Sequence, residues 1–444
     1  MTVETLGYRG EGIARIERKP VFIKGALPSE RVRALVLIVK KDYAVAKLLE
    51  VLSPSPHRVT PPCAVFGKCG GCDLMHSDYN GQLAFKRDAV RDALRKIAHI
   101  EPYVDECVPS DRVLGCRNKI SLPVRKTKDG AAAGLFAYNS HRVVSIDDCP
   151  LQTDRVRSVM PALKKFVSFF DPYDEERGEG ELRHIVARDL AGALSVTAVV
   201  TRDLSERIAR AAEEAELAAD ELWMNVNDLR TNVILGGDTR LLRGERSVRD
   251  ITIGGITLPV ETHPNAFYQV NGSIAAKLYE AVRMTAKNVK PRLIVDAYSG
   301  GGLMTALLSD CAERVFGVEI EPSAVAGADM LMQRAGIKNV RNILGDCSAE
   351  LPRLTHECGD DSLIVLDPPR SGCSEAVTSA VDASGASHVV YVSCDPSTLA
   401  RDLFRLPSYI VRSVRPFDMF PQTCHVETLV LLSKKKPDSH IVVD

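Results

Sequence analysis

Residues 292–302, RLIVDAYSGGG, decide the fold of this chain. An apolar, strand-like run ends there in a glycine-rich loop, and a helical stretch follows. Three further apolar runs come later, separated by helical stretches: RVFGVEI at 314–320, SLIVLDPP at 362–369 and HVVYVSC at 388–394. Strands that alternate with helices predict a parallel, doubly wound α/β sheet, which binds ligands at the carboxyl ends of its strands.

Length and composition are those of a globular protein with more than one domain. The chain has 444 residues, enough for two or three domains, and 45% of them are apolar and 26% charged. No apolar run is long enough to cross a bilayer, and the N-terminal MTVETLGYRG lacks the apolar core of a signal peptide, so we expect a cytoplasmic protein without a membrane partner. The twelve cysteines should then be reduced, and clustered ones should serve a metal or catalysis.

The part of the chain before the doubly wound sheet divides in two. Residues 1–54 alternate short β-rich runs with glycine and proline, as a small β-barrel would, and a Pro/Ser linker follows. Residues 55–258 are expected to form a mixed α+β central domain, with a cysteine cluster and an amphipathic helix near 80–98. Residues 259–444 are left for the C-terminal, Rossmann-like domain.

Two segments are basic although the whole chain carries a net charge of only −1. Residues 1–60 hold eleven Lys and Arg against six Asp and Glu, and residues 112–128 hold six basic residues and no acid. A solvated surface explains either segment alone, so together they are a weak indication of RNA binding. Lys119, Arg125 and Lys126 are the candidate phosphate contacts.

Three acidic residues come at or just after successive strand-like runs that follow the glycine loop. Glu319 ends the run RVFGVE, Asp346 follows the next run in ILGDCSAEL, and Asp367 ends SLIVLD. Glu319 is placed to accept hydrogen bonds from both hydroxyls of a ribose, and Asp346 suits an adenine amino group. Each acid alone could instead be a helix cap or a surface residue. The glycine loop alone would also suit NAD, but the six-residue glycine pattern of dinucleotide sites is absent, so the ordered set favours S-adenosylmethionine.

Cys394 is the candidate nucleophile. It follows the strand at 388–393, and the sequence predicts that Asp395 caps a helix whose first residue is Pro396. The positive end of that helix dipole favours a thiolate, whereas Asp395 opposes it. A buried, unreactive cysteine at a strand end is the alternative.

A nucleophile makes sense in a methyltransferase whose target carbon is weakly nucleophilic. A thiolate that adds to carbon 6 of uracil turns the ring into an enolate whose carbon 5 can attack a methyl sulfonium. A base must then remove the carbon 5 proton so that the thiol can leave. Glu427 and His425, at the start of a final strand in FPQTCHVETLVLL, could each be that base.

With these residues in place, the chain resembles the RNA 5-methyluridine (uracil-5-) methyltransferases, and most closely the bacterial 23S rRNA enzymes with an iron–sulfur cluster and a TRAM domain. The similarity covers nearly the whole chain, from GEGIARIERKPVFIKGALPSERV in the barrel through FYQVN and DPPR to SCDPSTLARDL and MFPQTCHVETLVLL. It implies that Cys394 is the nucleophile and Glu427 the base, with Arg117 and Phe267 near the target base. The S-adenosylmethionine site that it implies consists of Gln269, Tyr298, Gly300, Glu319, Asp346 and Asp367.

A few positions depart from the pattern of that family. Leu331 and Ala335 stand where the family usually has asparagine, Leu303 where threonine is common, and Cys116 where an aromatic residue is typical. These departures concern contacts to the cofactor and leave the reaction as it is.

Four cysteines form the candidate metal site: Cys63, Cys69 and Cys72 in CAVFGKCGGC, and the distant Cys149. Four thiolates can bind zinc or an iron–sulfur cluster, and the spacing leaves both open. It differs from the C-x3-C-x2-C of radical enzymes. The resemblance implies a [4Fe–4S] cluster, with a structural role because a two-electron methyl transfer needs no redox step.

The sequence therefore predicts an enzyme that methylates carbon 5 of a uridine in structured RNA. The barrel and the cysteine motif favour 23S rRNA before full ribosome assembly, with tRNA as the alternative, and we expect no obligate protein partner. Methylation of an exocyclic nitrogen is a rival, but its motif has an aromatic residue where Arg370 stands. An RNA-binding assembly factor with a vestigial methyltransferase fold is a further rival, against which the intact Cys394 and Glu427 argue.

Overall fold

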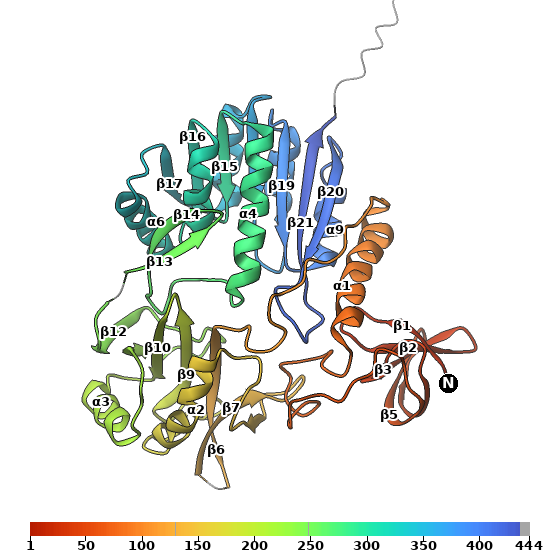
Figure 1. Ribbon diagram of the computed structural model, residues 1–444, viewed down its shortest axis with the longest axis vertical. Coiled ribbons are helices and arrows are strands. Elements are labelled where there is room, and N and C mark those ends of the chain that lie inside the picture. The colour runs from red at the N-terminus through yellow and green to blue at the C-terminus, as the bar shows by residue number, and fades with distance from the viewer. Residues whose placement is uncertain (129, 247, 436–444) are drawn as a thin grey trace, which may run out of the picture.

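The computed structural model describes residues 1–128, 130–246 and 248–435. Over these residues the chain forms four sheets (Figure 1). The N-terminal barrel and the central sheet lie below the C-terminal sheet in this view, and helix α1 (Tyr79–Ala93) rises from the barrel beside the last strands. The predicted α/β architecture, with a small β-barrel, a mixed α+β part and a Rossmann-like sheet, is confirmed.

The N-terminal sheet closes on itself. Its strands are β1 (Val3–Leu6), β2 (Gly12–Ile16), β3 (Lys19–Lys24), β4 (Arg31–Val39) and β5 (Ala44–Ser53). They pair in the order β1-β2-β3-β5-β4, and the amide of Val3 donates to the carbonyl of Glu30 (2.8 Å), which joins the first strand to the start of the fourth. Alternate residues of a strand share one face. The side chains that fill the interior are Val3, Ala14, Val21, Ile23, Val32, Ala44 and Ala46.

The central sheet has seven strands, and two helices pack against it. The strands are β6 (Lys119–Thr127), β7 (Gly130–Phe136), β8 (Val143–Ser145), β9 (Leu182–Leu190), β10 (Ala193–Val200), β11 (Glu221–Val226) and β12 (Asp238–Arg243). Their order is β12-β11-β10-β9-β6-β7-β8. Helices α2 (Asp154–Val167) and α3 (Ser205–Glu214) bury apolar side chains such as Phe166 and Ile208 in one core with strands β9 and β10.

The C-terminal sheet also has seven strands. They are β15 (Leu293–Ala297), β16 (Arg314–Glu319), β17 (Val340–Leu344), β18 (Ser362–Leu366), β19 (His388–Ser393), β20 (Tyr409–Phe417) and β21 (Glu427–Lys434). Their order is β17-β16-β15-β18-β19-β21-β20; the first five are parallel, and β21 runs antiparallel to both of its neighbours. The order reverses between β15 and β18, and open α/β sheets bind ligands at the strand ends of such a reversal.

Helices and one hairpin cover this sheet. The helices are α4 (Gly272–Val289), α5 (Leu303–Leu308), α6 (Pro322–Ala335), α7 (Cys347–Leu354), α8 (Glu375–Ala383) and α9 (Pro396–Phe404). Shorter turns are the π-helix Leu94–Ala98 and the 3-10 helices Ser309–Cys311 and Thr355–Glu357. The hairpin of β13 (Val248–Ile253) and β14 (Ile256–Glu261) packs its apolar residues against α5 and α6. No helix within the described ranges is long and apolar enough to cross a membrane.

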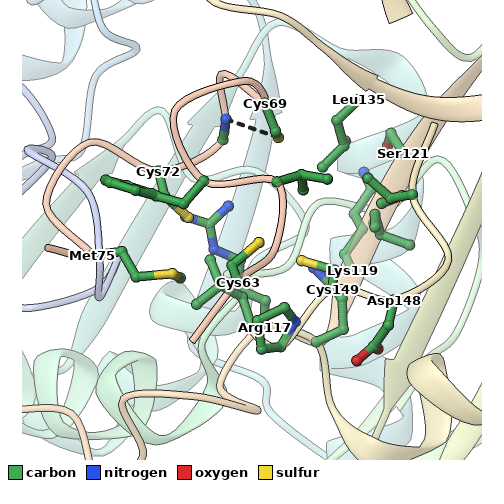
Figure 2. Close-up of a pocket in the computed structure, with 18 residues that line it drawn as sticks. Cys63, Cys69, Cys72, Met75, Arg117, Lys119, Ser121, Leu135, Asp148 and Cys149 are labelled. Carbon is green, nitrogen blue, oxygen red and sulfur yellow. Dashed lines mark hydrogen bonds between the residues drawn. The ribbon is translucent and has the colours of Figure 1, made fainter. Parts of the chain in front are cut away.

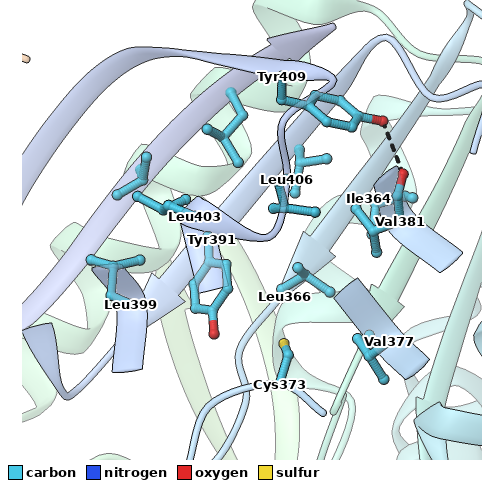
Figure 3. Packing of buried hydrophobic residues seen from close by; sticks show 14 of the residues in the cluster. Ile364, Leu366, Cys373, Val377, Val381, Tyr391, Leu399, Leu403, Leu406 and Tyr409 are labelled. Atoms are coloured by element: carbon cyan, nitrogen blue, oxygen red, sulfur yellow. Dashed lines mark hydrogen bonds between the residues drawn. The ribbon is translucent and has the colours of Figure 1, made fainter. Parts of the chain in front are cut away.

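The core on one face of the C-terminal sheet holds α9 firmly against β19. Apolar residues of α8 and α9, such as Val377 and Leu399, pack with Tyr391 of β19 (Figure 3). The Tyr391 hydroxyl donates to Asp402 Oδ2 (2.7 Å), and the amide of Cys373 donates to the same oxygen (2.7 Å). Because this fully buried carboxylate is paired, it ties α9 to the strand that leads into Cys394.

Candidate active site

Cys394 lies between the end of β19 and the start of α9. Asp395 caps that helix: its Oδ1 accepts hydrogen bonds from the amides of Ser397 (2.8 Å) and Thr398 (3.1 Å), and Pro396 is the first helical residue. The predicted cap is therefore confirmed. It leaves the half-buried Cys394 at the carboxyl edge of the sheet.

The strand register brings Cys394 and Glu427 opposite each other. Strands β19 and β21 pair antiparallel, and their last pair is Ser393 with Thr428. Cys394 directly follows the end of β19, and Glu427 is the first residue of β21. Facing residues of an antiparallel pair have Cβ atoms about 4.5–5.5 Å apart, so this register places the thiol and the carboxyl side by side.

Burial and charge perturb both groups. Burial and then the nearby Asp367 raise the pKa of Glu427 to about 8, while Arg370 opposes the rise. Burial and then Glu427 raise the pKa of Cys394 to about 11, and again Arg370 opposes. The predicted help of the α9 dipole to the thiolate is thus outweighed, because burial and carboxylates dominate around the thiol.

His425, the rival base, precedes β21. Burial, together with the Arg370 cation, lowers the pKa of His425, so the ring is neutral at physiological pH. It packs edge-on against Phe420, with ring centroids 6.0 Å apart. The strand register places Glu427 opposite the thiol, whereas His425 lies two residues away along the chain.

The glycine loop after β15 has the shape of a ligand loop. Tyr298 (φ 65°), Gly300 (φ 55°) and Gly302 (φ 77°) are left-handed, which is rare for a tyrosine and easy for glycine. A side chain on Gly302 would lie 2.7 Å from the Cβ of Ala328 in α6, but one on Gly300 would meet no protein atom within 4 Å. The amide of Gly300 donates to Glu319 Oε2 (2.9 Å), so the loop and the end of β16 form one edge.

Carboxylates collect at the ends of the strands on either side of the reversal. Asp346 is exposed and caps α7 by accepting from the amide of Ser348 (2.7 Å), as the alternative interpretation expected. Burial raises the pKa of Asp367 to about 7. Burial, with Asp367 and Glu319 nearby, also raises the pKa of Asp296 to about 7, and the Thr305 hydroxyl donates to it (2.6 Å).

Asp296 was not singled out from the sequence, although it stands in RLIVDAY. An acid inside a buried, apolar strand was the available signal, because burial of a carboxylate is costly and marks a functional position. Together these carboxyl groups make the strand ends acidic, with Asp296 and Asp367 partly protonated near neutral pH because they are buried. Such an edge attracts a cationic ligand, and the sulfonium of S-adenosylmethionine is one.

The predicted base-binding residues come from different parts of the chain. Asn118 pairs with the segment FYQVN, since its Nδ2 donates to the carbonyl of Gln269 (3.1 Å) and its amide to that of Val270 (2.8 Å). Phe267 in this segment is 69% exposed and free to meet a ligand. The Arg117 side chain lines the cysteine cavity described next (Figure 2), and its charge is also among those that lower the pKa of His425.

Cys63, Cys69, Cys72 and Cys149 line one cavity of about 140 Å³ (Figure 2). The pKa of Cys72 is raised to about 12, chiefly by burial; the Arg117 cation opposes the rise and the neighbouring thiols contribute to it. All twelve cysteines of the chain are free of disulfides. Among the described residues, no group of three or more His, Cys, Asp or Glu side chains is arranged to hold a single metal ion.

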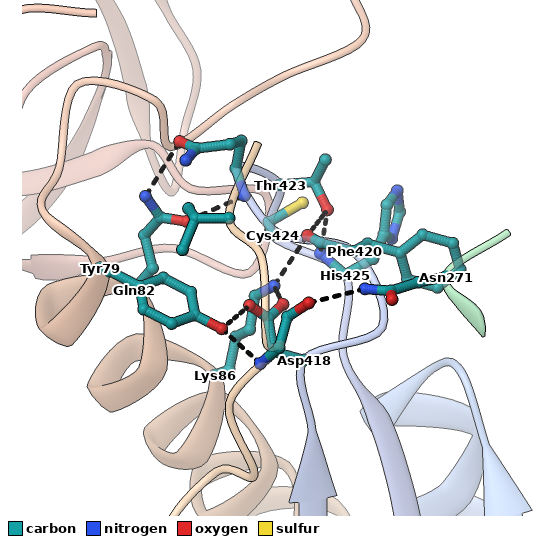
Figure 4. A network of polar contacts seen from close by, with 12 residues as sticks. Tyr79, Gln82, Lys86, Asn271, Asp418, Phe420, Thr423, Cys424 and His425 are labelled. Carbon is teal, nitrogen blue, oxygen red and sulfur yellow. Dashed lines mark hydrogen bonds and ion pairs between the residues drawn. The ribbon is translucent and has the colours of Figure 1, made fainter. Parts of the chain in front are cut away.

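A buried ion pair anchors the loop that leads into Glu427. Lys86 of α1 pairs with Asp418, and both side chains are fully buried (Figure 4). Lys86 also donates to the carbonyl of Phe420 (2.9 Å), and the Tyr79 hydroxyl donates to Asp418 Oδ2 (2.8 Å). Residues 418–425, the segment between β20 and β21, are therefore held by α1 rather than by their own strands.

The basic segment at 112–128 is engaged within the protein. Burial, together with Arg188, lowers the pKa of Lys119 to about 8, and Lys119 lines the cysteine cavity. Arg125 pairs with Glu175. Of the three candidate phosphate contacts, Lys126 is the exposed one.

A doubly wound sheet with this set of strand-end acids defines an S-adenosylmethionine-dependent methyltransferase. The chain belongs to the tRNA (uracil-5-)-methyltransferase family, whose sequence model matches residues 78–435. Residues 1–49 match the TRAM domain. The protein is thus an RNA methyltransferase by family, and the sequence-based family prediction is confirmed.

Relatives are similar over their full length. Uncharacterized RNA methyltransferases of Halalkalibacterium halodurans and Clostridium acetobutylicum are 36% and 34% identical, over 98% and 97% of this chain and 96% of each relative. The crystal structure of Pyrococcus abyssi tRNA (uracil-54, C5)-methyltransferase in complex with S-adenosyl-L-homocysteine has the same fold, with a TM-score of 0.76 and 24% identity. That similarity covers 97% of this chain and 99% of the other.

We expect the charges around Cys394 to control its reactivity in the free enzyme. Glu427→Gln should lower the pKa of the thiol because it removes a neighbouring carboxylate, and Arg370→Gln should raise it because it removes the cation. The measurement is the rate of Cys394 alkylation by iodoacetamide against pH, followed by peptide mapping. Arg415→Gln, which breaks a surface pair with Asp105, is the control. Identical profiles for all three variants would contradict the assignment of these charges.

We expect Lys86→Met to destabilise the protein by about 3 to 5 kcal/mol, because it leaves the Asp418 carboxylate buried without its cation. Adding Asp418→Asn should recover part of that loss. The measurement is the free energy of unfolding in urea. Lys96→Met, which removes an exposed pair with Asp92, should change it by less than about 0.5 kcal/mol. Equal effects of the two lysine substitutions would show that the buried pair does not anchor the loop.

Proposed function

We propose that the protein methylates carbon 5 of a uridine in structured RNA, with Cys394 as nucleophile and Glu427 as base. The observation that carries this proposal is the register of β19 and β21, which sets the two residues opposite each other at the carboxyl edge of the sheet. Neither methylation of an exocyclic nitrogen nor RNA binding alone needs a thiol beside a buried carboxyl. Arg370 stands where the motif for the former has an aromatic residue.

The proposed reaction uses each group once. The Cys394 thiolate adds to carbon 6 of the uracil. Carbon 5 of the resulting enolate then takes the methyl group from S-adenosylmethionine, and S-adenosylhomocysteine is the leaving group. The Glu427 carboxylate takes the proton from carbon 5, the carbon–sulfur bond to Cys394 breaks, and the thiolate is restored. A carboxyl whose pKa is about 8 is a stronger base than an ordinary glutamate once it is ionised.

The cofactor would lie over the carboxylate-rich strand ends. Gly300 offers open space beside Glu319, whose carboxylate would accept from the ribose. Gln269, Tyr298 and Asp346 would complete the site, as the resemblance implies. Asp367 and the additional Asp296 would face the sulfonium and stabilise its charge.

We propose that the four-cysteine cavity holds a [4Fe–4S] cluster with a structural role. Four thiols that line one cavity could hold zinc or an iron–sulfur cluster, and the resemblance favours the cluster. A cavity of about 140 Å³ lined by four thiols suits a larger group. Arg117 at its wall favours the thiolates that such a cluster requires.

Two kinds of RNA are candidate substrates. The barrel and the cysteine cavity favour 23S rRNA before full ribosome assembly, through the resemblance to enzymes with both features, whereas the family description names tRNA. The target uridine must be extruded or lie in a loop, because a thiolate cannot reach carbon 6 in a stacked helix. We propose the divisions 1–54 for RNA binding, 55–258 for the cluster and 259–444 for methyl transfer, in a cytoplasmic enzyme.

We expect Glu427→Gln to trap the reaction after methyl transfer, because nothing removes the carbon 5 proton. Incubated with labelled S-adenosylmethionine and unmodified 23S rRNA or tRNA, this variant should accumulate a methyl-labelled protein–RNA adduct on denaturing gels. Cys394→Ala, alone or combined with it, should form none while still binding S-adenosylmethionine. The RNA that gives the adduct is the substrate.

Two outcomes would contradict this assignment. If His425→Ala traps the adduct while Glu427→Gln turns over, His425 is the base. Full methylation by Cys394→Ala would remove covalent catalysis, and with it the argument for carbon 5.

We expect anaerobically purified protein to be brown, with a broad absorbance near about 400 nm and about four iron and four sulfide per chain. Cys69→Ser should lose the metal and lower stability, because binding energy at such a site is largely folding energy. Cys311→Ser, remote from the cavity, is the matched control and should keep the iron. Stoichiometric zinc without labile sulfide would contradict the cluster.

A further inference from the structure

A loop of the N-terminal barrel reaches the nucleophile. The turn between β1 and β2 carries Tyr8, whose hydroxyl donates a hydrogen bond to Asp395 Oδ2. Asp395 is the residue directly after Cys394, and 387 positions of sequence separate it from Tyr8. The barrel is therefore in contact with the catalytic loop as well as available to RNA.

Asp395 joins three parts of the site with different atoms. Its Oδ1 caps α9. Its backbone amide donates to Ser393 Oγ (3.2 Å), and the Ser393 hydroxyl donates to the Asp395 carbonyl (3.0 Å). Oδ2 is the atom that receives the Tyr8 hydroxyl. The carboxylate is thus tied to α9 and to Tyr8, and the Asp395 backbone is tied to Ser393 on the other side of Cys394.

The Tyr8 loop also touches the segment that leads to the base. The loop is a tight turn, in which the amide of Gly10 donates to the carbonyl of Gly7 (2.9 Å). Gly10 has a φ of 78°, and a Cβ there would lie 3.1 Å from Leu74. The amides of Asp73 and Leu74 both donate to the carbonyl of Gln422 (3.0 Å each), in the loop before Glu427. The barrel loop thus contacts the segment of Cys394 directly, through Tyr8 and Asp395. It reaches the segment before Glu427 through one neighbour, Leu74.

We propose that Tyr8 is a positioning residue for Cys394: its hydroxyl fixes the Asp395 carboxylate and offsets the charge of that carboxylate beside the thiol, so the barrel completes the active site. This inference rests on the proposed role of Cys394 as nucleophile. It extends the proposed role of the barrel from RNA binding to catalysis.

Electrostatics supports the same role. Asp395 is among the groups that raise the pKa of Cys394, and Asp395 raises that of Tyr8 as well, after the larger effect of burial. Tyr8 therefore remains a phenol, able to donate, throughout the working pH range. Without the donated hydrogen bond, the full charge of Asp395 would act on the thiol and hold it protonated to a higher pH.

The alternative is that Tyr8, which is 46% exposed, only stacks on a base of the RNA. Stacking uses the ring, whereas positioning uses the hydroxyl. Tyr8→Phe separates the two, because it keeps the ring and removes the hydroxyl.

The test measures three properties of Tyr8→Phe: RNA affinity, the rate of Cys394 alkylation against pH in the free enzyme, and the rate of adduct formation in the Glu427→Gln background. We expect unchanged RNA affinity, an alkylation profile displaced to higher pH and an adduct rate reduced roughly fivefold, as for one lost hydrogen bond to a charged group. In an Asp395→Asn background, which keeps the cap and removes the charge, Tyr8→Phe should no longer displace the profile. Tyr43→Phe, a barrel tyrosine that packs on Phe22, is the matched control.

Two results would overturn the inference: a wild-type alkylation profile for Tyr8→Phe, or an equal displacement with and without the Asp395 charge. A loss of RNA affinity in Tyr8→Phe would instead assign Tyr8 to RNA contact. Failure of the proposed function is distinguishable, because it appears as absence of any adduct in Glu427→Gln with Tyr8 intact. The alkylation profiles of the free enzyme still decide the link between Tyr8 and Asp395 in that case.

Discussion

The antiparallel pairing of β19 with β21 is the constraint on which the site depends. The parallel strand β19 leads into Cys394 at the carboxyl edge of the sheet. If a neighbouring parallel strand supplied the partner carboxyl, that residue would stand on the loop after that strand, one strand spacing away from Cys394. Because β21 runs in the opposite direction, it begins where β19 ends, so Glu427 lies next to the end of the strand that leads into Cys394. The hairpin at the end of the fold is therefore part of the chemistry.

The segment between β20 and β21 has no strand partners of its own, so contacts from other parts of the chain must fix its position. The buried Lys86–Asp418 pair and the hydrogen bonds to Gln422 hold it from α1 and from the segment after the cysteine motif (Figure 4). Such a pair adds little stability over apolar residues but fixes one geometry, because either charge alone would be buried unpaired. The parts of the chain outside the methyltransferase sheet thus set the position of the base.

Local signals in the sequence predicted the sheet, the glycine loop and the Asp395 cap, because each depends on neighbours within a few residues. The sequence showed only that Cys394 and Glu427 stand at the ends of two late strands. That these two strands pair with each other, and in which register, could be seen only in the folded structure. Lys86 on an amphipathic helix reads as a solvated residue, and its partner lies 332 positions away. Arg117 was expected near the target base through resemblance, which stays a prediction; that it also lines the cysteine cavity could not be read from the sequence, because no pattern along the chain encodes which way that side chain turns.

The raised pKa values of Cys394 and Glu427 describe a resting state in which the thiol and the Glu427 carboxyl are largely protonated. Asp367 disfavours ionisation of Glu427, and both carboxyls disfavour ionisation of Cys394, whereas burial alone raises the pKa of Asp367. In the proposed reaction, a sulfonium bound at the strand ends would bring a positive charge beside these groups and lower all three pKa values together. Activation of the thiol would then be coupled to occupation of the cofactor site, which would limit reactions of Cys394 with other electrophiles when no methyl group is available.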